Sequence, residues 1–218
     1  MNDNRATKTF AKSLGILVGL AGIEHGYYEF LQGGIRPDSI MIDAIGIAQK
    51  NWKYAIETAL TIIPSFLISG ILAMIIGFMV VIWAYAFIDR KFGAVILLFL
   101  SISLFLFGGG FAPIFLTILA FVAATRINKP LIWWQSRSPP IFRRMMAMLW
   151  PWSLIASILM FAMAVEIAIF GYPLLSAYDP ETTYSIQFSL GMGMLLLSIL
   201  SLPAAFAHDA QRQNDLTS

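Results

Sequence analysis

Six apolar runs dominate the pattern of hydrophobic and polar positions along the chain. They cover residues 11–31, 59–88, 92–107, 111–125, 147–171 and 185–207, and polar, charged or glycine-rich segments separate them. A helix of about 20 apolar residues crosses the roughly 30 Å hydrocarbon core of a bilayer. The pattern therefore predicts an all-α protein, a polytopic transmembrane helix bundle with six spans in a single domain of residues 1–218.

The third and fourth runs are short, and Gly108, Gly109 and Gly110 separate them. Consecutive glycines are unfavourable inside a helix, so the sequence predicts a tight turn between two short spans. A re-entrant hairpin over 92–125 is the alternative interpretation. Pro64 lies near the start of the second run and predicts a hinge there, because proline interrupts the hydrogen bonds of a helix.

Two of the connections carry patterns of their own. Apolar residues recur at helical spacing over 38–56, which predicts an amphipathic helix on the outer surface, either across the mouth of the bundle or as a simple anchor. Residues 126–146 are rich in arginine and tryptophan and predict a basic cytoplasmic loop. This loop either binds anionic lipid or only orients the protein in the membrane.

The positive charges give the predicted spans a direction. With both termini inside, eleven of the 14 Lys and Arg residues fall on the cytoplasmic side, and only Arg36, Lys50 and Lys53 fall outside. Positive charge favours the cytoplasmic side of a membrane. We therefore expect a multi-pass protein of the prokaryotic plasma membrane with both termini in the cytoplasm.

Composition narrows the possible chemistry. The chain is 59% hydrophobic and 12% charged, which excludes an ordinary soluble domain of 218 residues. It has no cysteine, so disulfides, thiolate metal sites and thiol catalysis are excluded. The net charge of +2 gives no reason to expect a nucleic acid, and the main partner is the lipid bilayer.

Four glycines form a stripe along the first apolar run. Gly15, Gly19, Gly22 and Gly26 recur at steps of three or four residues, so they share one side of a helix. Small residues let two helix backbones approach closely within a bilayer. The stripe therefore predicts a packing face, for a neighbouring helix of the chain, for a second copy or for another membrane protein.

The same run also carries ionisable residues, Glu24, His25 and Glu29. An ionisable group facing hydrocarbon costs roughly 2.5–3.5 kcal/mol, so these side chains should face protein or water. Glu166, near the outer end of the fifth run, is expected at a similar depth. Together the four residues are candidates for a proton, cation or substrate site.

Three classes of function follow from these candidates. The first is a proton- or cation-linked transporter or channel for a small solute, and the second is a membrane scaffold in which the polar cluster only fixes helix packing. The third is a metal-dependent enzyme, which the sequence favours least because adjacent Glu24 and His25 are expected to point apart on a helix. No enzyme motif is present and no cofactor is predicted; the sequence leaves a metal undecided.

The segment from Ala21 to Gly26, with Glu29 and with the later triple glycine, resembles a set of uncharacterised prokaryotic membrane proteins of about this length. The resemblance implies a layout of six spans. That layout is also similar to the substrate-capturing subunits of energy-coupling-factor vitamin transporters, which have six helices and small-residue packing faces. This second similarity concerns architecture only.

Overall fold

The computed structural model describes residues 4–171 and 179–215, and helices make up most of this part of the chain. The elements are α1 (Arg5–Leu31), β1 (Met41–Asp43), a short 3-10 helix (Ile47–Gln49), β2 (Thr58–Leu60), α2 (Phe66–Ala86), α3 (Gly93–Leu106), α4 (Ala112–Ala124), α5 (Ile132–Ser136), α6 (Pro140–Phe170) and α7 (Pro180–Asp215). Long apolar helices of this kind agree with the predicted all-α membrane bundle.

Helix length separates the apolar helices into two groups. Within the described residues, α1, α2, α6 and α7 are long and apolar enough to cross a membrane. Helices α3 and α4 have only 14 and 13 residues, so each extends about 20 Å at 1.5 Å per residue. The chain reverses between them at Gly108–Gly110, where Gly108 and Gly110 have positive φ angles of 98° and 82°.

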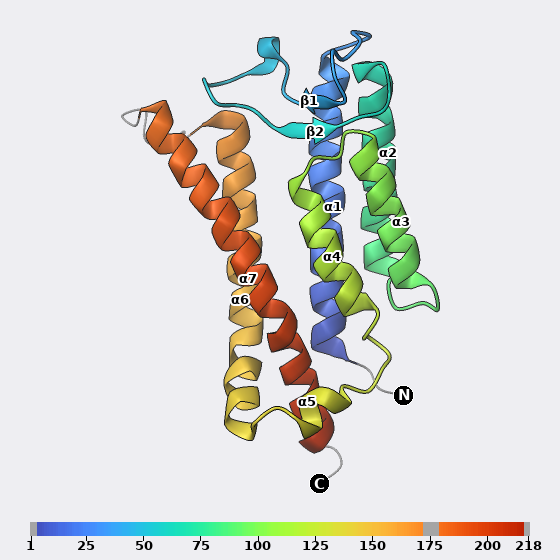
Figure 1. Ribbon diagram of the computed structural model, residues 1–218, viewed down its shortest axis with the longest axis vertical. Coiled ribbons are helices and arrows are strands. Elements are labelled where there is room, and N and C mark those ends of the chain that lie inside the picture. Colours follow the sequence, from blue (N-terminus) through green and yellow to red (C-terminus); the bar gives the residue numbers. More distant parts are fainter. Residues whose placement is uncertain (1–3, 172–178, 216–218) are drawn as a thin grey trace.

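Helix α1 lies at the centre of the arrangement (Figure 1), with α2, α3 and α4 packed around it. Helices α6 and α7 form a second group, and in Figure 1 the upper end of α7 lies away from α1 while its lower end approaches α1. Helix α1 begins and α7 ends at the same end of the molecule. The two short strands lie at the opposite end.

The glycine stripe of α1 packs against helices of its own chain. A Cβ atom on Gly19 would lie 2.6 Å from the carbonyl oxygen of Gly77, and one on Gly26 would lie 2.7 Å from that of Gly70. Added Cβ atoms on Gly70 and Gly77 would in turn meet the carbonyls of Gly26 and Gly19. These distances allow no side chain, so the backbones of α1 and α2 touch at two reciprocal glycine pairs.

The other two glycines of the stripe face α3 as well as α2. A Cβ on Gly15 would lie 2.6 Å from Cβ of Ala84, with Leu97 beyond it, and one on Gly22 would meet Leu104. The stripe is therefore covered within the chain. A second copy or another protein would have to displace α2 or α3 to use it.

The predicted surface helix over 38–56 is wrong. The connection instead contains β1 and the 3-10 helix, and β1 pairs with β2 in an antiparallel ladder that joins Ile42 to Ala59. Ile42, Ala44 and Ala59 form a small apolar core of their own. The apolar spacing fitted a helix locally, but pairing with a segment later in the chain determined the backbone.

The start of the second span also differs from the prediction. Residues 59 and 60 belong to β2, and α2 begins at Phe66, so Pro64 precedes the helix and is no hinge within it. Proline has no N–H and disfavours helical geometry in the residue before it. Pro64 therefore sets the place where the helix can begin.

The connection over residues 126–146, predicted to be cytoplasmic, and the C-terminal tail are more helical than expected. Residues 126–146 contain α5 and the first turns of α6, and α7 continues past 207 to Asp215. The added part of α7 contacts α1. The carboxylate of Asp209, which is 2% exposed, accepts hydrogen bonds from the backbone N–H groups of Ala6 and Thr7 at 3.0 and 2.8 Å.

Candidate functional site

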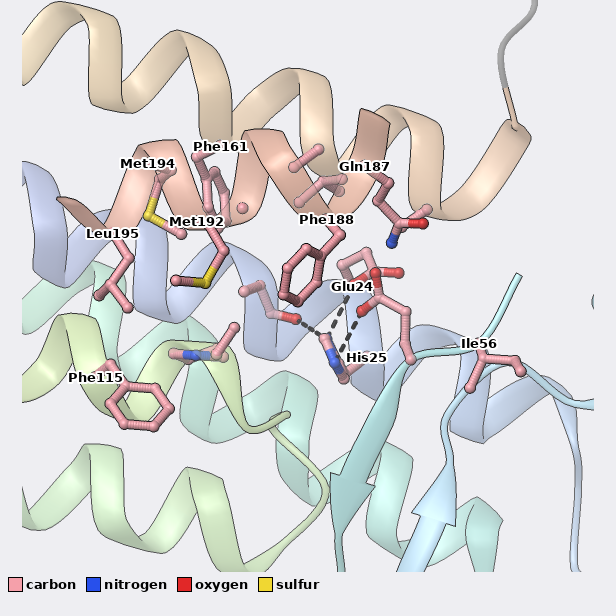
Figure 2. A pocket seen from close by; sticks show the side chains of 18 of the residues that line it. Glu24, His25, Ile56, Phe115, Phe161, Gln187, Phe188, Met192, Met194 and Leu195 are labelled. Carbon is pink, nitrogen blue, oxygen red and sulfur yellow. Dashed lines mark hydrogen bonds and ion pairs between the residues drawn. The ribbon is translucent and has the colours of Figure 1, made fainter. Parts of the chain in front are cut away.

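The site is a cluster of two carboxylates around one imidazole. Glu24 and His25 belong to α1, and Glu57 belongs to the connection just before β2. His25 Nε2 lies 2.8 Å from Oε2 of Glu57, and Nδ1 lies 3.0 Å from Oε2 of Glu24 (Figure 2). His25 is 7% exposed, so these interactions are sheltered from solvent.

The surroundings of His25 define where its hydrogens lie. Nδ1 is 2.9 Å from the carbonyl oxygen of Ala21, one helical turn earlier. A carbonyl only accepts hydrogen bonds, so Nδ1 is the donor. The Nε2 atom then faces Oε2 of Glu57, and two lone pairs at 2.8 Å would repel each other. A proton or another cation must therefore lie between Nε2 and Glu57.

Glu57 lies outside the membrane-spanning helices, and its side chain is 11% exposed. Burial alone raises the pKa of a carboxyl group. The charge of His25 and the hydrogen bond from its ring are the largest of the influences that oppose burial, and the pKa of Glu57 is lowered below its ordinary value. Glu57 is therefore ionised at neutral pH.

Glu24 has an incomplete set of partners. Both of its carboxylate oxygens are buried, and neither accepts a hydrogen bond from any described residue. The contact with Nδ1 of His25 is an ion pair without hydrogen-bond geometry, because the N–H points to Ala21. The expectation that Glu24 and His25 point apart is wrong, because Oε2 of Glu24 lies 3.0 Å from Nδ1 of His25.

The glycine turn between α3 and α4 closes the site on one side. A Cβ on Gly110 would overlap Nε2 of His25, and one on Gly108 would overlap the carboxylate of Glu29. The N–H of Gly108 donates to the carbonyl of Leu60 at 2.8 Å, which fixes the turn beside the strand that follows Glu57. Only glycine combines the positive φ with this close approach.

Glu29 lies one turn beyond His25 on α1 and is fully buried. Its two carboxylate oxygens accept no hydrogen bond within the described part of the chain. It faces Gly108, whereas the ring of His25 faces Gly110 and the donor atoms of Glu24, His25 and Glu57 lie close to one another. Glu29 is therefore a neighbour of the cluster rather than a member of it.

An apolar cavity of about 440 Å³ opens beside the cluster, between α1, α4, α6 and α7. Figure 2 shows Glu24, His25 and Gln187 toward one side of it, with Ile56 beyond them, and a wall of apolar side chains on the other side. That wall includes Phe115, Phe161, Phe188, Met192, Met194 and Leu195. The volume is in the range of sites that bind small organic molecules.

Glu166 does not take part in the cluster. Its side chain is exposed, and it does not line the cavity. The prediction used equal depth along two helices, but the exposed side chain of Glu166 lies on a face of α6 that does not contribute to the cavity. Glu57 takes the place predicted for Glu166. The sequence signal for it was an acid between Ile56 and Thr58, directly before an apolar run.

One nitrogen of His25 and one oxygen each of Glu24 and Glu57 lie within 4.8 Å of one another. Three donors at this separation can surround one small cation. The chemical capacity of the site is thus to bind a cation at the polar end of an apolar cavity. Comparisons of the chain with models of protein families, with curated proteins and with solved structures find no match.

Proposed function

We propose that the chain is a multi-pass protein of a prokaryotic plasma membrane, with six spans and both termini in the cytoplasm. Four long apolar helices support insertion, and α3 and α4 complete the six as short spans. The side chain of Asn4 donates to the carbonyls of Arg126 and Lys129, so the basic segment lies at the end where α1 begins. The positive-inside rule assigns this end to the cytoplasm.

Within this topology, the proposed function is cation-linked transport of a small solute. The observation that carries the proposal is the convergence of Glu24, His25 and Glu57 at the polar end of the apolar cavity. Intramembrane ionisable groups are costly and typically mark ion or substrate pathways. The cluster would bind the cation, and the cavity would bind the solute.

The position of the cavity supports coupling between the two. It lies between α6 and α7 on one side and α1 and α4 on the other, so a change in its width requires these helices to move. A cation that binds one arrangement of the helices more tightly shifts the population toward that arrangement. Cation binding and access to the cavity both depend on the positions of these helices, so the two are linked.

The scaffold alternative has less support. It depends on a free packing face, and the glycine stripe of α1 is covered by α2 and α3. A purely structural cluster would also satisfy its polar atoms internally, because unpaired buried groups are costly. The buried oxygens of Glu24 have no hydrogen-bond partner among the described residues.

The test is charge movement in proteoliposomes on a solid-supported membrane, after a step in pH or in divalent-cation concentration. The full-length protein should give a transient current, and Glu57→Gln should lose most of it. Glu166→Gln is the matched control, since it removes an exposed carboxylate outside the cavity. Its current should equal that of the unchanged protein.

Folding of each variant is checked by gel filtration and thermal unfolding in detergent. If Glu57→Gln does not fold, Glu24→Gln replaces it, because that change leaves the contact between His25 and Glu57 in place. Full currents in the folded variant would refute a role for the cluster. The absence of current in the unchanged protein after both kinds of step would refute cation-linked transport.

A further inference from the structure

We infer that Glu24, His25 and Glu57 form a binding site for a divalent transition metal ion such as Zn²⁺, an inference that rests on the cation-linked function proposed above. The three donor atoms lie within 4.8 Å of one another. Bonds from Zn²⁺ to nitrogen or carboxylate oxygen are about 2.0–2.2 Å, so donors around it are separated by roughly 3–4 Å. The separation of the donor atoms in this cluster is therefore close to the separation that such an ion requires.

The orientation of the imidazole supports a metal ligand. Metal-binding histidines commonly donate the N–H of the second ring nitrogen to a carbonyl or carboxylate, which fixes the ring. In His25, Nδ1 lies 2.9 Å from the carbonyl oxygen of Ala21. The Nε2 atom is thereby directed toward Oε2 of Glu57. These are the two atoms between which a cation is needed.

Glu24 distinguishes a metal ion from a proton. A single proton between Nε2 and Glu57 satisfies that pair and leaves the two buried oxygens of Glu24 without a hydrogen bond. A metal ion accepts several donors at once, so it would also satisfy Glu24. A cluster built only to hold one proton has no need for this second buried carboxylate.

The surroundings leave room for the ion and for one further ligand. Gly110 has a positive φ of 82°, and its lack of a side chain lets the ring of His25 lie directly against the turn. Glu24, His25 and Glu57 also line the cavity of about 440 Å³, from which water or a solute can reach the ion. Three protein ligands with one open position are typical of zinc sites that exchange ligands.

The donor set indicates the class of metal. One imidazole and two carboxylates are nitrogen and oxygen donors suited to Zn²⁺, Co²⁺, Mn²⁺ or Fe²⁺. Soft ions such as Cu⁺ prefer sulfur, and the three donor groups of the cluster contain none. Zn²⁺ and its spectroscopic substitute Co²⁺ are therefore the probes of choice.

The experiment uses the full-length protein in detergent, without an affinity tag and stripped of metal by a chelator. Titration with Co²⁺ is followed by its visible absorption, and Zn²⁺ is then added to displace it. We expect one ion per chain. Glu24→Gln and Glu57→Gln should each weaken binding by at least about tenfold, and Glu166→Gln should bind as the unchanged protein does.

His25→Ala should abolish binding, and thermal unfolding without metal shows which variants are folded. The inference is overturned if no saturable binding occurs, or if both glutamine variants bind as tightly as the unchanged protein, which would indicate ions held elsewhere. Currents after pH steps without Zn²⁺ binding would make the proton the cation and leave transport intact. Zn²⁺ binding without any current would instead keep the metal site and remove transport.

Discussion

At the scale of single residues, the site depends on the contacts of His25 and on the lack of a side chain at Gly110. Nδ1 of His25 donates its hydrogen to the carbonyl of Ala21, and Nε2 faces a carboxylate oxygen of Glu57. A cation is therefore required between Nε2 and Glu57. The ring can occupy this position only because Gly110 has no Cβ atom. The turn between α3 and α4 therefore determines where the ring of His25 in α1 can lie.

A first prediction follows for Gly110→Ala. The positive φ alone costs an alanine roughly 1–2 kcal/mol, and the overlap with Nε2 adds to this. We expect a lower thermal unfolding temperature and weaker cation binding. Gly34→Ala is the control, because nothing lies within 4 Å of its added Cβ. Equal losses in the two variants would mean that the contact with His25 is unimportant.

At the scale of elements, the central contact is the crossing of α1 and α2. The pairs Gly19 with Gly77 and Gly26 with Gly70 bring the two backbones together at two levels. In a bilayer this packing replaces the hydrophobic driving force, because lipid tails are as apolar as the side chains. The crossing fixes the distance of α1, and therefore of His25, from α2.

The second prediction concerns Gly26→Ala. Its added methyl group would lie 2.7 Å from the carbonyl oxygen of Gly70 and 2.8 Å from the backbone nitrogen of Met74. Overpacking of this kind costs about 1–3 kcal/mol, which should appear as a lower midpoint of unfolding in denaturing detergent. Gly191→Ala, in α7 with nothing within 4 Å, should be neutral or stabilising by up to about 1 kcal/mol.

At the scale of the whole molecule, the cavity lies between the α1–α4 group and the α6–α7 group, and polar contacts join the two groups at both ends of the molecule. Asp209 of α7 caps the first turn of α1 through its bonds to Ala6 and Thr7. Trp52, in the connection at the opposite end, donates from Nε1 to the carbonyl of Ala168 in α6. These polar contacts connect the groups on either side of the cavity.

The third prediction concerns Asp209→Ala. Removal of a helix-capping side chain typically costs about 0.5–2 kcal/mol, and here the cap also joins α1 to α7. We expect a lower midpoint of unfolding, with cation binding at the distant cluster unchanged in the folded protein. An unchanged midpoint would show that apolar packing alone holds the two groups together.

The sequence by itself determined the local features of this protein. The apolar runs predicted the helices, the triple glycine predicted the reversal between α3 and α4, and the stripe in α1 predicted a close packing face. Each of these depends on neighbours within a few turns, because helix periodicity and glycine conformation are local properties. Glu24 and His25 were recognisable for the same reason, as ionisable residues within an apolar run.

Only the tertiary structure decided which distant residues meet. Glu57 joins the cluster because β1 and β2 pair and Gly108 bonds to Leu60, contacts between segments far apart in the chain. Glu166 stays outside it because the rotation of α6 about its axis directs that side chain outward. Depth in a membrane can be counted along a helix, but the direction in which a residue faces another helix depends on packing that no local pattern contains.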